Sequence, residues 1–282
     1  MELWKQWRLG LYEKALPDNL NWEERLIEAK AAGYHFMEMS VDESDERIAR
    51  LDWSRKEVER VLHFSREAEL PIESICFSAQ RLFPLGSGLP GGEQQALKLL
   101  EQAVRLAACM GIRIIQLQGY DCYYGETSGA TTKERFLRNL SKGVAYAASY
   151  GVTLALETME NDFMNTIEKA MYYVKEVNSP YLQVYPDIGN ISNATQYVCR
   201  DIRAGKGHIV AAHLKETVPG KFREIPYGAG HVNFPFAIRT LWDQGVRRYV
   251  AEFWHLGEEN WREIARKNRL FLQEQFEAAM KL

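Results

Sequence analysis

Short apolar runs alternate with longer amphipathic segments along the whole chain. The runs are rich in β-branched and aromatic residues, which predicts strands, and the intervals between them each leave room for one helix. This alternation is typical of repeated strand-then-helix units around a parallel sheet. The predicted strands are 8–12, 35–41, 72–78, 113–119, 152–157, 182–187, 209–214 and 249–254.

Helical periodicity is clearest between residues 93 and 110. Apolar side chains recur there at a spacing that puts them on one face, as expected for a helix packed on a sheet. Gly33, Gly111 and Gly151 are predicted to end helices, because glycine adopts the left-handed conformation that follows many of them. The predicted buried face consists of Leu97, Leu100, Ala103, Val104, Ala107 and Ala108.

Eight strand-helix units are compatible with a closed barrel or with an open doubly wound sheet. An open sheet places its ligand at one crevice, whereas here polar residues end most strands, as the catalytic face of a barrel requires. We therefore predict an α/β protein with a single (β/α)₈ TIM barrel. Since no change in composition marks a linker, residues 1–282 are assigned to one domain.

Composition narrows the classes of partner. The 35 basic and 38 acidic residues are spread along the chain and give a formal net charge of −3. Without a basic arm or an acidic tail, we expect no nucleic-acid partner and no membrane partner. The four cysteines lack the close spacing of a zinc ribbon or a redox pair, and no stretch approaches the length of a membrane span. A cytoplasmic location is expected.

Four consecutive predicted strands end in residues that suit metal coordination. Glu157, Asp187, His213 and Glu252 occupy these positions in strands five to eight. Any one of these acids could simply cap the next helix or pair with a lysine. Three carboxylates at one rim, however, would repel one another and raise their own pKa values unless a cation lay among them. One imidazole among oxygen ligands suits Mn²⁺, Mg²⁺, Co²⁺ or Zn²⁺, so one divalent metal ion is predicted.

Several longer segments are similar to those of a known family. LALETM, YPDIGN, HLKET, FREIPYGAGHVNF and VAEFW resemble the xylose-isomerase-like barrels, and specifically the L-ribulose-5-phosphate 3-epimerases. QRLFPLGS at 80–87 and IQLQGYDCYY at 115–124 resemble two loops of that family. The resemblance covers nearly the full chain.

The resemblance implies an activity and a division of roles. It implies that Glu157, Asp187, His213 and Glu252 bind the metal, and that Glu157 and Glu252 are also the catalytic acid/base pair. The implied reaction is the metal-dependent interconversion of L-ribulose 5-phosphate and L-xylulose 5-phosphate, an isomerase reaction. Inversion at C3 requires loss of the proton alpha to the C2 carbonyl and its return on the other face, through a cis-enediolate. A homodimer is also implied, with loops 80–92 and 119–130 as a potential interface.

Other residues are candidates for contact with a ketose phosphate. Arg223 matches an arginine that precedes the aromatic-glycine turn of the family, and its fork of donors suits vicinal oxygens or a phosphate. Lys215, Asn190 and His231 are further substrate-binding candidates, although a surface ion pair for Lys215 and a solvated His231 are the alternatives. Asn190 could also orient Asp187. Asn233 stands where the family more often has an aspartate.

Three other functions stay open at the level of sequence. The same barrel could epimerise or isomerise an unphosphorylated ketose, because a phosphate site made of backbone donors leaves no sequence signal. An AP-endonuclease-like hydrolase is disfavoured by the small number of histidines, six in the chain. A non-catalytic sugar-binding barrel is the third alternative.

Overall fold

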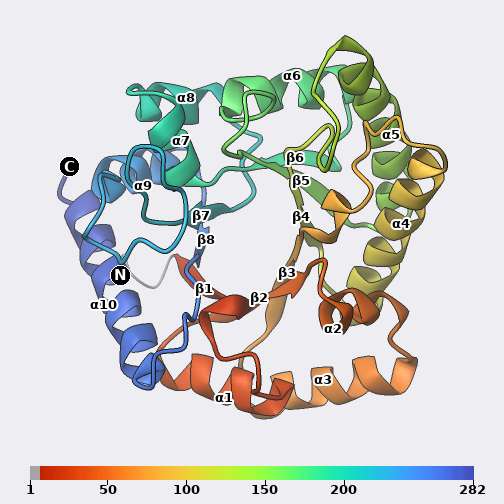
Figure 1. Ribbon diagram of the computed structural model, residues 1–282. Helices are drawn as coiled ribbons and strands as arrows, with labels where there is room; N and C mark the ends of the chain where they lie inside the picture. The colour runs from red at the N-terminus through yellow and green to blue at the C-terminus, as the bar shows by residue number, and fades with distance from the viewer. Residues whose placement is uncertain (1–6) are drawn as a thin grey trace. The chain divides into compact units, whose positions relative to one another are not determined.

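A computed structural model describes residues 7–282 (Figure 1), and the contacts within it divide the chain into two compact units. The first unit contains the residues up to Glu38, Val61–Ile72 and Tyr185–Leu282. The second contains Met39–Arg60 and Glu73–Val184. Each unit has its own parallel strands and its own covering helices.

The strands of the first unit lie in the order β2, β1, β8, β7, and all their pairings are parallel. Leu11 of β1 pairs with Met37 on one side and with Ala251 on the other. Leu214 of β7 also pairs with Ala251. The strands are β1 (Arg8–Tyr12), β2 (Phe36–Val41, of which Phe36–Glu38 belongs to this unit), β7 (Ala212–Leu214) and β8 (Arg248–Ala251).

Helices of the first unit cover these strands with apolar side chains. Phe276 of α10 stacks on Trp7 with ring centroids 3.8 Å apart, and α10 also packs along α9 (Figure 1). Arg262 donates to Glu28 and ties α10 to α1. The helices are η2 (Glu13–Ala15), α1 (Trp22–Ala31), α7 (Ile188–Ala194), α8 (Val198–Ala204), α9 (Phe234–Asp243) and α10 (Trp261–Ala279).

The second unit repeats the arrangement with strands in the order β6, β5, β4, β3. Its long helices α4 and α5 pack against each other, as Figure 1 shows. The strands are β3 (Ile72–Phe77, of which Ile72 belongs to the first unit), β4 (Ile114–Gln118), β5 (Thr153–Glu157) and β6 (Leu182–Tyr185, of which Tyr185 belongs to the first unit). The helices are α2 (Asp45–Ile48), η3 (Ala49–Asp52), η4 (Ala79–Arg81), α4 (Gly92–Met110), α5 (Ala130–Ser149) and α6 (Ile167–Val177), while α3 (Arg55–Glu67) belongs to both units.

All eight predicted strands are present, with shifts at their ends. β7 begins at Ala212 instead of residue 209, and β8 ends at Ala251 instead of residue 254. Ile209 and Val210, at the start of the predicted strand, are partly exposed, which fits a connection better than a strand buried on both faces. The assignment of residues 1–282 to one domain stays a prediction.

The prediction for residues 93–110 is confirmed as α4, which starts at Gly92. Gly111 ends it with a φ of +74°, in the left-handed region that glycine adopts without strain. Leu97 and Ala108, predicted to be buried, are half-exposed because they lie at the edges of the apolar face. Among residues 7–282, no helix combines the length and the apolar character that a membrane crossing requires.

His35 lies near the amino-terminal ends of the strands of the first unit. Its Nδ1 accepts a hydrogen bond from the backbone N–H of Leu9 at 2.9 Å. Burial and the positive charges of Arg269 and Arg8 lower the pKa of His35 from its ordinary value of 6.5. The folded chain therefore favours the neutral imidazole.

A stability test follows from this pKa. A depressed pKa means that the unfolded chain takes up a proton more readily, so the stabilisation is present above pH 6.5 and is lost as the pH falls below it. The amide oxygen of His35→Asn can still accept a hydrogen bond from Leu9 but takes up no proton. When the pH is lowered from ~7.5 to ~5.5, we therefore expect the melting temperature of this variant to fall less than that of the natural chain. Melting temperatures of the metal-free proteins would check this, and an equal loss in both would contradict it.

Candidate metal centre

Backbone pairing brings three of the predicted metal ligands together within the first unit. Asp187 and His213 form an isolated parallel β-bridge, and the N–H of His213 donates to the carbonyl of Pro186 at 2.9 Å. The N–H of Glu252 donates to the carbonyl of Leu214 at 3.0 Å. The three side chains therefore leave neighbouring strands at the same end.

These three side chains form a compact and buried donor set. Asp187, His213 and Glu252 each offer one ligand atom, and these atoms lie within 4.8 Å of one another. The exposed fraction is zero for Asp187 and His213 and 7% for Glu252. Two carboxylates and an imidazole are ligands that Mn²⁺, Zn²⁺ and related ions accept. A divalent cation therefore fits this donor set.

Asp187 is held in place by the first turn of α7. Its Oδ1 accepts from the backbone N–H groups of Gly189 at 2.8 Å and Asn190 at 3.2 Å. A Cβ at Gly189 would lie 2.7 Å from the carbonyl oxygen of Lys215, so only glycine fits there without displacing the backbone. Asp187 therefore caps α7, the alternative to metal binding that the sequence left open, and also belongs to the donor set.

Lys215 supplies a positive charge to the same carboxylates. Its Nζ forms an ion pair with Asp187 Oδ2, donates to Asn190 Oδ1 at 2.9 Å and lies 3.7 Å from Glu252 Oε2. The side chain is 6% exposed, so the alternative of a surface ion pair is wrong. Asn190, itself buried, contacts Asp187 through its backbone and Lys215 through its side chain.

Glu252 is surrounded by positive charge. Burial alone would raise the pKa of this carboxyl group, but the charges of Lys215, His213 and Arg223 outweigh burial and hold the pKa well below its usual range. Glu252 is therefore a carboxylate at neutral pH, ready to bind a cation or to accept a proton.

His213 lies between two carboxylates. Its Nδ1 is 3.0 Å from Glu252 Oε2, and its Nε2 is 2.6 Å from Glu38 Oε1. Glu38 is fully buried in β2 and was not among the predicted site residues. The available signal was a charged residue in the middle of the apolar run HFMEMSV, where a strand buried on both faces should carry none.

Glu157, the fourth predicted ligand, belongs to the second unit. It is the last residue of β5, is 2% exposed, and pairs in register with Gln118 of β4. The pKa of Tyr120 is raised by burial, by Glu160 and, to a lesser extent, by the charge of Glu157. The position at the carboxyl end of a strand agrees with the expectation from sequence.

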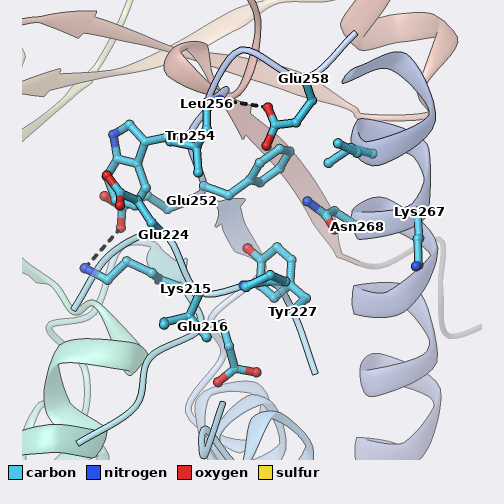
Figure 2. A pocket seen from close by; sticks show the side chains of 14 residues that line it. Lys215, Glu216, Glu224, Tyr227, Glu252, Trp254, Leu256, Glu258, Lys267 and Asn268 are labelled. Atoms are coloured by element: carbon cyan, nitrogen blue, oxygen red, sulfur yellow. Dashed lines mark hydrogen bonds and ion pairs between the residues drawn. The ribbon is translucent and has the colours of Figure 1, made fainter. Parts of the chain in front are cut away.

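A cavity of about 210 Å³ opens beside the donor set. Figure 2 shows Lys215 directed toward the carboxylate of Glu252 at one wall, while Lys267 and Asn268 project from α10 at another. Trp254 also lines the cavity. A space of this size suits a small metabolite, since drug-sized ligands occupy pockets of roughly 300 Å³ or more.

The loop that carries Arg223 is fastened by Glu216. The carboxylate of Glu216 accepts from the backbone N–H groups of Gly228 at 3.0 Å and Val232 at 3.1 Å. Arg223 is exposed, with its guanidinium 5.6 Å from the ring centroid of Trp254. The next residue, Glu224, has a φ of +60°, a strained conformation for a residue with a side chain.

The remaining predicted residues lie in the same loop region. His231 is exposed, and its Nε2 is 3.3 Å from Thr217 Oγ1. Asn233 caps α9, because its Oδ1 accepts from the N–H of Phe236 at 3.4 Å. An asparagine can therefore replace the aspartate of the family as a cap without a charge.

Comparison with known proteins identifies relatives along nearly the whole chain. The family described as xylose isomerase-like TIM barrel matches residues 26–275. L-ribulose-5-phosphate 3-epimerase UlaE of Escherichia coli O139:H28 is 45% identical over 251 residues, which is 89% of this chain and 88% of that protein. The epimerase of the same name from Shigella sonnei is equally similar.

Solved structures agree on the fold. The structure titled L-ribulose 3-epimerase has a TM-score of 0.79 at 20% identity, covering 97% of this chain and 96% of that one. D-psicose 3-epimerase from Clostridium cellulolyticum H10, solved with D-tagatose, also has a TM-score of 0.79, at 16% identity, covering 95% of this chain and 98% of that one.

These comparisons confirm the predicted fold class, a (β/α)₈ TIM barrel, and the predicted class of enzyme, an isomerase of the epimerase type. The family match spans well over half of the chain, and the 45% identity extends across most of both proteins. The chain belongs to the xylose isomerase-like TIM barrel family and, within it, to the L-ribulose-5-phosphate 3-epimerases.

Proposed function

We propose that this protein interconverts L-ribulose 5-phosphate and L-xylulose 5-phosphate with the help of one divalent metal ion. The observation that carries the proposal is the buried set of Asp187, His213 and Glu252 beside a small cavity, in a chain whose relatives are named for L-ribulose 5-phosphate epimerisation.

The proposed metal site has Glu157 as its fourth ligand. Two features support this role: Glu157 is a buried acid at the carboxyl end of a strand, and the carboxyl ends of the strands carry the active site in TIM barrels. Metal identity stays open among Mn²⁺, Mg²⁺, Co²⁺ and Zn²⁺.

The two glutamates are proposed to carry the proton. One carboxylate removes the proton at C3 of the ketose from one face, and the other returns it to the opposite face, so the sugar need not turn over between the steps. The lowered pKa of Glu252 means that it is a carboxylate at neutral pH, the form that a general base requires. When bound, a divalent metal ion supplies Lewis-acid stabilisation of the negative charge that develops on the substrate oxygens.

Arg223, Lys215, Asn190 and His231 are proposed to bind the substrate. Arg223 and Lys215 both lie near Trp254 and carry positive charge toward the cavity side of the donor set. Asn190 acts indirectly, because its Oδ1 accepts a hydrogen bond from the ammonium of Lys215. His231 is supported only by its place in the loop that Glu216 fastens.

The direct test of the reaction is isotope exchange. With L-ribulose 5-phosphate in deuterated water, we expect deuterium at C3 of both the product and the recovered substrate, because the proton passes through a solvent-exchangeable carboxyl group. Chelation should abolish the reaction and added Mn²⁺ should restore it. Free L-ribulose in a parallel reaction tests the unphosphorylated alternative. An absence of exchange at C3 would contradict the proposed epimerisation.

The two-base scheme makes a reciprocal prediction. Glu252→Gln should lower the rate of epimerisation by about 10²–10⁴, the usual contribution of one general acid or base. The Glu252→Gln variant should still exchange the C3 proton of one epimer, the one whose C3 proton faces Glu157. The Glu157→Gln variant should exchange the C3 proton of the other epimer. Nuclear magnetic resonance of each epimer in deuterated water would measure this. Glu160→Gln, an exposed acid after β5, is the control.

Lys215 is expected to affect metal and substrate in opposite directions. Its ammonium contacts two of the metal ligands, so Lys215→Met should bind Mn²⁺ more tightly, by roughly tenfold or about 1.4 kcal/mol. The same variant should raise KM for the phosphorylated ketose, because a positive charge near the substrate is lost. Titration calorimetry and steady-state kinetics would measure the two effects.

The matched control for that variant is Lys267→Met, which removes a lysine from another wall of the same cavity. It should leave the affinity for Mn²⁺ unchanged. Weaker Mn²⁺ binding by Lys215→Met would contradict the competition between ammonium and metal.

A homodimer in the cytoplasm completes the proposal. Its support is a group of exposed apolar side chains in the loops at 80–92 and 119–130. These side chains are Leu82, Phe83, Leu89 and Tyr124. Gel filtration of the natural chain measures the oligomeric state.

A further inference from the structure

We infer that Glu38 is a positioning residue that orients the ring of His213, so that Nδ1 faces the metal and Nε2 carries the hydrogen. The inference rests on the proposed function only in taking Asp187, His213 and Glu252 as metal ligands. It assigns a role to a buried acid that contributes no ligand atom to the donor set.

The contacts of the imidazole distinguish its two nitrogens. Nδ1 lies 3.0 Å from Glu252 Oε2 and so faces the donor set, whereas Nε2 lies 2.6 Å from Glu38 Oε1 on the other side of the ring. A carboxylate can only accept at that distance, so the nitrogen beside Glu38 must donate. Without a metal ion, Nδ1 can likewise donate to Glu252. A metal ion held by the donor set would take the place of that hydrogen on Nδ1, and Nε2 would keep the hydrogen that Glu38 accepts.

Glu38 is itself fixed from the other side. Its Oε2 accepts a hydrogen bond from the hydroxyl of Tyr185 at 2.8 Å. The side chains of Glu38, Tyr185 and His213 are all fully buried. The ring of Tyr185 also packs edge-on against His213, with centroids 4.9 Å apart. Tyr185 therefore holds both the carboxylate and the ring that the carboxylate orients.

A carboxylate in this position has two effects on a metal ligand. It selects the tautomer and the ring orientation, and its negative charge makes the imidazole a better donor to the metal. Glu38→Gln keeps the shape of the side chain and removes the charge. We expect it to raise the Kd for Zn²⁺ and Mn²⁺ by about 10–100-fold, the usual cost of losing such a partner.

The first experiment needs neither substrate nor turnover. Full-length protein labelled with ¹⁵N-histidine is loaded with Zn²⁺, and ¹⁵N resonance identifies which nitrogen of His213 is bound to the metal. Metal on Nδ1 with hydrogen on Nε2 supports the inference, and metal on Nε2 overturns it. Because no sugar is present, the result is independent of whether the natural chain epimerises L-ribulose 5-phosphate.

The second experiment compares metal affinity among three variants by titration calorimetry. Tyr185→Phe keeps the carboxylate but removes one hydrogen bond to it, so a smaller loss of about fivefold is expected. Tyr185→Phe also carries the test if Glu38→Gln fails to fold. Glu13→Gln is the matched control, since Glu13 is a fully buried acid of the same unit whose carboxylate pairs with Arg25.

The outcomes separate orientation of His213 from a general effect on stability. A loss of metal affinity in Glu38→Gln and Tyr185→Phe but not in Glu13→Gln supports the inference. Natural affinity in both Glu38→Gln and Tyr185→Phe, or an equal loss in Glu13→Gln, overturns it. Thermal unfolding of the metal-free variants shows separately how much each substitution costs the fold.

Discussion

The site depends on neutralising negative charge that is buried in one place. Asp187, Glu252 and Glu38 are three acids with little or no exposure, and each charged carboxylate would be costly without a partner. Lys215 and His213 lie among them and provide the partners. A divalent metal ion would meet the same requirement, which is why the ammonium and the metal are expected to compete.

The short strand β7 makes this arrangement possible. His213 and Lys215 are two residues apart, and side chains at that spacing on extended backbone point to the same side. Leu214, between them, is buried and contributes its backbone carbonyl to the N–H of Glu252. One strand end thus supplies an imidazole and an ammonium to carboxylates from the strand ends on its two sides. Buried ion pairs of this kind contribute little net stability, so the stability of the fold does not account for this cluster of charges.

The loop after β7 is organised by a further buried acid. Glu216 binds backbone N–H groups of Gly228 and Val232 and so holds the segment that carries Arg223 near the cavity. Glu224, whose backbone conformation is strained, lies in this segment directly after Arg223. Side-chain variation in such a loop can change the substrate while the metal ligands on the strands stay in place.

The amino-acid sequence by itself determined the eight strands, the family and the four candidate ligands. These features are local, because an apolar run, a charged residue at its end and a family motif can each be read within a few residues. The roles of Glu38 and Lys215 were decided only by tertiary structure. Glu38 meets His213 across 175 residues of chain, and Lys215 is buried only because strand pairing brings Asp187 and Glu252 beside it. Which charges neutralise one another depends on distances of a few ångströms between remote segments, and local sequence patterns carry no such information.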